Sequence, residues 1–181
     1  MASLLHEARA TPLFFAAPLT GGAGQLLAFT MHHQEQTNWC WAAVATSTAG
    51  FYDSNTGGAQ CGLVNAELEL AKCCASGWDA DCNVAWYLDA ALQRVGHLRD
   101  VSEDKAPWDT VTAEIDAGHA LGVRIGWEGG GGHFVIVAGY DRNGEMLEIR
   151  DPWWGDSSVP YDRFPDSYQG RGSWTHSYRT Q

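Results

Sequence analysis

The segment QTNWCWAA places Cys40 between two tryptophans, Trp39 and Trp41. Asn38 is a favourable N-cap, so we expect a helix over residues 39–52 with Cys40 in its first turn. Unpaired backbone N–H groups and the positive end of the helix dipole favour a thiolate at that position. Cys40 is therefore a candidate nucleophile. The two tryptophans are candidate walls of a substrate cleft, although such tryptophans more often belong to a core.

A thiolate nucleophile needs a base, and the base needs a group that orients it. Among the seven histidines, His133 opens a predicted strand directly after four glycines. The absence of bulky neighbours there would let a substrate backbone approach closely, which makes Gly132 a further cleft candidate. His133 is the predicted base, and the alternative is an ordinary histidine at the end of a strand.

The turn that follows this strand predicts which residue orients His133. Residues 141–144, DRNG, suit a type I turn followed by a left-handed glycine. The resulting pairing sets Asp151 opposite Val135 and diagonal to His133, whereas a slip of two residues would set it directly opposite His133. In both registers the two side chains share a face, with β carbons about 5–8 Å apart. Asp151 is therefore the predicted partner, unless it is only a turn residue before Pro152.

Two glutamines precede the cysteine and could supply an oxyanion hole. Gln34 lies six residues before Cys40, and its amide N–H could meet a developing oxyanion together with the Cys40 backbone N–H. Gln36 is the competitor for this role, and a solvated loop glutamine is the alternative for both. Trp127 and Trp153 are additional candidates for the cleft walls. The chemistry needs no cofactor, and we expect no metal site.

These motifs resemble those of the bacterial papain-like cysteine proteases, and among them the group that contains a plant-immunity-suppressing type III effector protease. The resemblance covers Q-x-x-x-x-W-C-W-A-A from residue 34, GGHFVIVAGYD from residue 131 and IRDPWWG from residue 149. The gap of 93 residues between Cys40 and His133 is shorter than the roughly 130–150 residues of papain, and the C-G-x-C signature is missing. The resemblance therefore says nothing about substrate specificity.

The resemblance also implies a role for each residue. In the family a glutamine six residues before the nucleophile forms the oxyanion hole, and Gln34 matches it. Cysteine, histidine and Asn/Asp follow in the chain order seen here for Cys40, His133 and Asp151. A tryptophan two residues beyond the Asn/Asp often shields its hydrogen bond to the histidine, and Trp153 occupies that position. A protein or peptide substrate follows from these roles.

The other cysteines cluster within 22 residues, at positions 61, 73, 74 and 82. An odd total with one outlying cysteine suggests two disulfides and one free thiol. Cys73 and Cys74 are neighbours and are not expected to bond each other, which leaves two connectivities for Cys61 and Cys82. The alternatives are five reduced core thiols, a zinc site that lacks the usual C-x-x-C spacing, and an imperfect calcium loop from Asp79.

Composition limits the class of protein. The chain has 181 residues, of which 45% are hydrophobic and 18% charged, and its net charge is −11. These values predict one folded domain and argue against a nucleic acid or an anionic membrane as partner. Residues 1–30 are expected to form a loose arm without a standard signal peptide. Clustered cysteines imply an oxidising destination. The resemblance instead implies a secreted or exported bacterial effector that acts inside a host cell, and a cytoplasmic protein is the alternative.

The remaining patterns predict an α+β papain-like fold. Apolar residues recur at helical spacing over 63–74, 84–96 and 107–118, and β-branched residues favour strands over 120–127, 133–140, 146–151 and 173–179. We expect a peptidase domain over residues 31–181, with a helical lobe (31–118), an antiparallel β lobe (119–181) and a cleft between them. The predicted function is a cysteine peptidase. The alternatives are an acyltransferase or transpeptidase with the same triad, and a non-catalytic binding module.

Overall fold

The computed structural model describes residues 23–54, 58–164 and 168–181. The described residues form an α+β fold, as predicted, with an antiparallel sheet whose strands run in the order β2-β7-β3-β4-β5-β6, while β1 pairs with β4. The helices are α1 (Cys40–Tyr52), α2 (Gln60–Leu68), α3 (Leu88–Arg94) and α4 (Trp108–Asp116). The strands are β1 (Gly24–Leu26), β2 (Leu98–Ser102), β3 (Leu121–Trp127), β4 (Gly132–Asp141), β5 (Met146–Asp151), β6 (Gly155–Pro160) and β7 (Gly172–Thr180).

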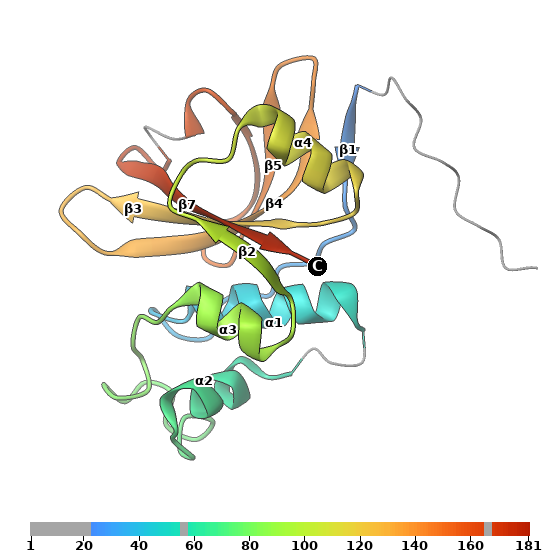
Figure 1. The fold of residues 1–181 in the computed structure, drawn as a ribbon. Coiled ribbons are helices and arrows are strands. Elements are labelled where there is room, and N and C mark those ends of the chain that lie inside the picture. Colours follow the sequence, from blue (N-terminus) through green and yellow to red (C-terminus); the bar gives the residue numbers. More distant parts are fainter. Residues whose placement is uncertain (1–22, 55–57, 165–167) are drawn as a thin grey trace, which may run out of the picture.

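The helices cover both faces of the sheet. Helices α1, α2 and α3 gather on one side, and α4 lies on the opposite side (Figure 1). Helix α1 contacts β4 and α3, while α4 contacts β4, β3 and β1. Strand β4 therefore lies between two helical layers, and eight of its ten residues are buried. This burial on both faces explains why its sequence is almost continuously apolar.

Helix α1 is the central element of the helical side. Its first ten residues, Cys40–Ala49, are all buried. Alanines at positions 42, 43 and 45 leave no accessible surface and let neighbouring elements approach closely. Because α1 packs on several sides at once, its position, and with it that of Cys40, is strongly determined by the core.

The hairpin of β4 and β5 adopts the first of the two predicted registers near the site. Ile136 pairs with Arg150 and Val137 with Ile149, so Asp151 lies diagonal to His133, and a bulge then shifts the pairing by one residue toward the turn. At Gly139, beyond the bulge, an added β carbon would lie 2.6 Å from the Gln25 carbonyl oxygen of β1. The close approach of β1 therefore requires a glycine there.

Several predicted boundaries were wrong. The predicted helices over 63–74 and 84–96 are shorter, because residues 70–85 form a disulfide-linked loop between α2 and α3. Strand β2 lies within the predicted helical lobe but joins the sheet through β7. The predicted loose arm over residues 1–30 contains β1 and the buried residues Leu27 and Phe29, so its last part belongs to the folded domain. Residues 1–22 lie outside the described part.

The cysteine cluster forms two disulfides, Cys61–Cys74 and Cys73–Cys82, and Cys40 is a free, buried thiol. The prediction of two bridges and one free thiol is confirmed, and the structure selects one of the two connectivities left open. Bonded sulfurs are not available as zinc ligands, and Asp79 and Asp81 lie within 3.2 Å and 2.7 Å of the Lys72 ammonium. In the described part of the chain, no helix has the length and apolar character of a membrane span.

Candidate active site

Cys40 is the first residue of α1, and its backbone N–H has no acceptor within the helix. The predicted cap was wrong: Trp39 occupies the N-cap position, and no side chain caps the helix. Asn38 instead binds Asn83, with its backbone N–H donating to Asn83 Oδ1 (2.9 Å) and its Nδ2 donating to the Asn83 carbonyl (2.8 Å). Asn83 Nδ2 also donates to Thr37 Oγ1 (2.9 Å). The residues before Cys40 are thus held by another segment rather than by a cap.

The two tryptophans beside Cys40 anchor the same segment. Trp39 Nε1 donates to the Cys82 carbonyl (2.8 Å), and Trp41 Nε1 donates to the Val84 carbonyl (3.0 Å). Both indoles are buried, with relative exposures of 1% and 0%. Trp39 is therefore a core residue and not the cleft wall that was predicted, whereas Trp41, although buried, lines a hollow beside Cys40, as predicted. Cys82 belongs to a disulfide, so these bonds tie α1 to the bridged loop.

His133 and Asp151 lie together, as the register predicts. His133 Nε2 and Asp151 Oδ1 are 2.9 Å apart, and both side chains are buried. The same carboxylate oxygen accepts hydrogen bonds from the backbone N–H groups of Trp153 (2.7 Å) and Trp154 (2.9 Å). Oδ2 accepts a hydrogen bond from the Tyr168 hydroxyl (2.5 Å). Since Nε2 holds Asp151, Nδ1 is the imidazole nitrogen left for Cys40.

These contacts determine the charge of the imidazole. Burial lowers the pKa of His133, but hydrogen bonds to Asp151 and Cys40 outweigh burial, and the pKa rises from 6.5 to about 9. For Asp151, burial raises the pKa, but the contacts with His133, Tyr168 and the Trp154 backbone lower it below its usual range. At neutral pH the site therefore holds an imidazolium between a carboxylate and the Cys40 sulfur.

Aromatic rings enclose the imidazole. Trp127 stacks on His133 with ring centroids 6.1 Å apart, and Trp154 packs edge-on at 5.1 Å. Trp153, predicted to shield the His133–Asp151 bond, stacks instead on His33 at 5.6 Å. The shielding indole is therefore that of Trp154, one residue further along the chain. These rings limit the access of water to the bond between His133 and Asp151.

Gln34 reaches the site, but its amide hydrogens are already in use. Its backbone N–H donates to the Pro152 carbonyl (3.0 Å), which brings it beside the Asp151 loop. Its Nε2 donates to the carbonyls of Gln36 (2.8 Å) and Thr37 (2.9 Å), and its Oε1 is buried with no partner among the described residues. Gln36 points elsewhere, since its Nε2 lies beside Gly77. Of the two glutamines, only Gln34 lines the space around Cys40.

Two adjoining hollows meet at the thiol. One has a volume of about 740 Å³ and the other about 560 Å³, and Cys40, Ala85, Gly131 and Gly132 line both. The smaller hollow holds the predicted residues Gln34, Trp127, His133 and Trp153, together with Trp154, Gln169 and Arg171. A β carbon at Gly132 would lie 3.0 Å from the Arg124 guanidinium and from the Ile125 carbonyl oxygen, so this position accepts little more than a glycine.

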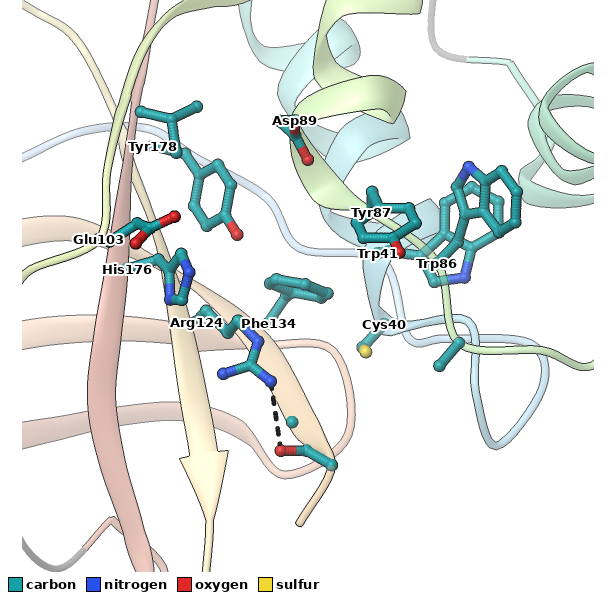
Figure 2. Close-up of a pocket in the computed structure, with 14 residues that line it drawn as sticks. Cys40, Trp41, Trp86, Tyr87, Asp89, Glu103, Arg124, Phe134, His176 and Tyr178 are labelled. Atoms are coloured by element: carbon teal, nitrogen blue, oxygen red, sulfur yellow. Dashed lines mark hydrogen bonds between the residues drawn. The ribbon is translucent and has the colours of Figure 1, made fainter.

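Residues from both the sheet and the helical side line the larger hollow (Figure 2). Arg124, Phe134, His176 and Tyr178 come from the sheet, whereas Trp86, Tyr87 and Asp89 come from the helical side. The Tyr178 hydroxyl points into the hollow, and Cys40 lies at its edge. Burial, more than the nearby charges of Asp89 and Arg124, raises the pKa of Tyr178 to about 12. The predicted cleft between helices and sheet is thus present, and it passes over Cys40.

An α+β fold of this kind, with a buried thiol on a helix and an imidazole on the facing sheet, defines the class of papain-like cysteine peptidases. The chain belongs to the Peptidase_C39-like family, whose family model matches residues 26–179.

Comparison with solved structures finds similar proteins. The chain is similar to xylellain, a cysteine protease from Xylella fastidiosa, with a TM-score of 0.50 and 14% identity over 87% of this chain and 85% of that chain. It is also similar to the Pseudomonas avirulence protein AvrPphB, with a TM-score of 0.43 and 14% identity over 84% of this chain and 97% of that chain. A search of curated protein sequences finds no match.

Three residues that contact His133, Asp151 or the segment before Cys40 were not predicted from the sequence. Trp154 adjoins Trp153, and only the backbone conformation decides which indole turns toward His133. Asn83 contacts the segment before Cys40 from 45 residues away in the chain. Tyr168 reaches Asp151 from the segment between β6 and β7, and no local sequence pattern marks it.

Proposed function

We propose that the protein hydrolyses peptide bonds with Cys40 as nucleophile, His133 as general acid and base, and Asp151 as the residue that orients the imidazole. The observation that carries the proposal is the buried pair of His133 and Asp151, 2.9 Å apart, in a hollow that Cys40 also lines. This arrangement lies where two hollows meet, so a peptide that crosses the cleft would present a carbonyl carbon to the sulfur. Its family membership supports the same reaction.

The reaction has two stages. The Cys40 thiolate attacks the carbonyl carbon, and the N–H of Cys40 stabilises the oxyanion. The His133 imidazolium then gives its Nδ1 proton to the leaving amine as the C–N bond breaks and a thioester remains. A water molecule gives a proton to the neutral imidazole and attacks the thioester, which releases the acid and restores the thiolate–imidazolium pair.

Gln34 is the proposed second donor of the oxyanion hole. In the present arrangement its Nε2 donates to two carbonyls, so the amide must exchange one of these bonds for the oxyanion. The buried, unpaired Oε1 supports such a movement, because the present orientation leaves a polar atom without a partner. We also propose that the protein acts in an oxidising compartment, since its disulfides are stable there.

Proteome-derived peptides incubated with wild type and with Cys40→Ala would test the activity. We expect cleavage products with new amino termini from the wild type alone, and their sequences would define the preferred residues on both sides of the cut. Products joined to an added amine would indicate acyl transfer in place of hydrolysis. No cleavage, combined with alkylation of Cys40 no faster than that of an exposed thiol, would indicate a binding module.

A further inference from the structure

The Asp151 carboxylate is bound unevenly at its two oxygens. Three hydrogen bonds, from His133 and from the backbone N–H groups of Trp153 and Trp154, end on Oδ1. Oδ2 has one hydrogen-bond donor among the described residues, the hydroxyl of Tyr168 at 2.5 Å. The Asp151 side chain has 0% exposure, so solvent does not replace a lost donor without rearrangement.

Tyr168 presents this hydroxyl from a well-packed position. Its backbone exchanges two hydrogen bonds with Gly172, both 2.9 Å long, which close a tight turn. Its ring, 4% exposed, packs edge-on against Phe164 (5.0 Å) and Trp154 (6.3 Å) and stacks on Trp127 (6.5 Å). Two of these rings also contact His133. Tyr168 therefore belongs to the aromatic wall of the site and needs little ordering to donate its hydrogen bond.

An unpaired Oδ2 would change how Asp151 holds the imidazole. A buried carboxylate oxygen without a donor costs the full loss of hydration, so the carboxylate would rotate toward another donor or take up a proton. Both responses weaken the bond from Oδ1 to His133. The other charged or titratable groups near the pair are Cys40, which contacts His133, and Arg171, which lines the same hollow. In the structure, Oδ2 accepts its hydrogen bond from the Tyr168 hydroxyl and not from Arg171.

We propose that Tyr168 is a positioning residue of the peptidase, whose hydroxyl holds the Asp151 carboxylate so that Oδ1 stays bound to His133. The proposal rests on the proposed function, in which His133 transfers the proton. Tyr168 makes no contact with the reacting atoms and acts only through Asp151. It would extend the catalytic arrangement to a fourth side chain, contributed by the segment just before β7.

Tyr168→Phe tests the proposal because it keeps the ring and removes the hydroxyl. We expect kcat/KM to fall about 10- to 100-fold with KM little changed, since a hydrogen bond to a charged group is lost. The alkaline limb of the pH profile should move to lower pH, because the imidazolium is less stabilised. Tyr140→Phe is the matched control: Tyr140 also donates to a carboxylate, Asp116 Oδ1 at 2.6 Å, but on the α4 side of the sheet. It should leave the profile unchanged.

The rate of Cys40 alkylation by iodoacetate, measured against pH, is the second readout, because the His133 imidazolium attracts this anion and the rate falls when the imidazolium loses its proton. It follows the thiolate–imidazolium pair even if no peptide is cleaved, so failure of the proposed function is distinguished from failure of this inference. An alkaline limb and a rate equal to those of wild type in a folded Tyr168→Phe protein would overturn the proposal. If that variant does not fold, 4-aminophenylalanine at position 168 replaces it. This weaker donor should move the limb part of the way, and an unmoved limb would again overturn the proposal.

Discussion

At the scale of single residues, the chemistry depends on two buried groups whose charges support each other. His133 alone would lose its proton on burial, and Asp151 alone would gain one. Together they reverse both tendencies, because each supplies the charge that the other needs. The Cys40 thiol, on the opposite side of the imidazole, completes the arrangement at the start of α1.

Asp151→Asn should remove the main cause of the raised pKa of His133. In the wild type the imidazolium is lost as the pH rises through about 9, so alkylation of Cys40 by iodoacetate, an anion that the imidazolium attracts, should decline there. In the variant this decline should move to lower pH, and kcat/KM should fall at least about tenfold. The stability linked to the raised pKa of His133 is complete below pH 6.5 and is lost as the pH rises toward 9. A variant whose alkylation profile overlays that of wild type would contradict this assignment.

Gln34→Ala tests the oxyanion hole. We expect kcat to fall about 10²- to 10³-fold, as for removal of one oxyanion donor, while Cys40 alkylation keeps its rate. Gln36→Ala is the matched control, because its amide lies beside Gly77 and not in the hollow. Equal losses of kcat in the two variants would show that the effect comes from the loop and not from a donor.

At the scale of elements, the site depends on how a loop holds a helix. The backbone carbonyls of Cys82 and Val84 accept hydrogen bonds from the two indole N–H groups beside Cys40. Between them, Asn83 forms hydrogen bonds with Thr37 and Asn38, the two residues before Trp39. Cys82 is fixed in turn by its disulfide to Cys73. Helix α1 therefore begins where it does because of tertiary contacts, in the absence of a capping side chain.

Removing each disulfide in turn distinguishes its effect on the stability of the protein from its effect on the position of Cys40. We expect Cys73→Ser/Cys82→Ser and Cys61→Ser/Cys74→Ser to lower the free energy of unfolding by about 2–4 kcal/mol each. Only the first pair should also slow Cys40 alkylation in the folded protein, because only Cys82 accepts a hydrogen bond from Trp39. Urea unfolding and alkylation rates measure the two effects. Equal slowing by both pairs would refute a specific role for the Cys73–Cys82 bridge.

At the scale of the whole molecule, the two sides of the cleft share one core. The buried cluster runs from α1 and α3 through the sheet to α4. Strand β2 comes from the helical half of the chain yet pairs with β7, near the C-terminus. The cleft therefore lies between surfaces of one cooperative unit and not between two independent domains.

Unfolding should accordingly be a single transition. Tryptophan fluorescence reports both sides of the cleft, and far-ultraviolet circular dichroism reports helices and strands, so their urea midpoints should coincide under oxidising conditions. A first transition in fluorescence that leaves the β structure intact would show that the sides unfold separately.

The sequence alone predicted a cysteine peptidase and the approximate placement of its candidate residues. Local patterns identify a cysteine at a helix start, and hairpin pairing brings His133 and Asp151 together, because sheet register follows from turn and alternation. The sequence also predicted the α+β class, two disulfides and one free thiol.

Only the tertiary structure decided the contacts between segments far apart in the chain. Asn83 replaces the predicted cap at α1, Trp154 replaces Trp153 beside His133, and Tyr168 reaches Asp151 from outside the hairpin. The strands β1, β2 and β6 likewise depend on their pairing partners rather than on their own short sequences. The physical reason is the same in each case: local pattern specifies which face or turn a residue occupies, whereas packing of distant segments decides which side chain meets it.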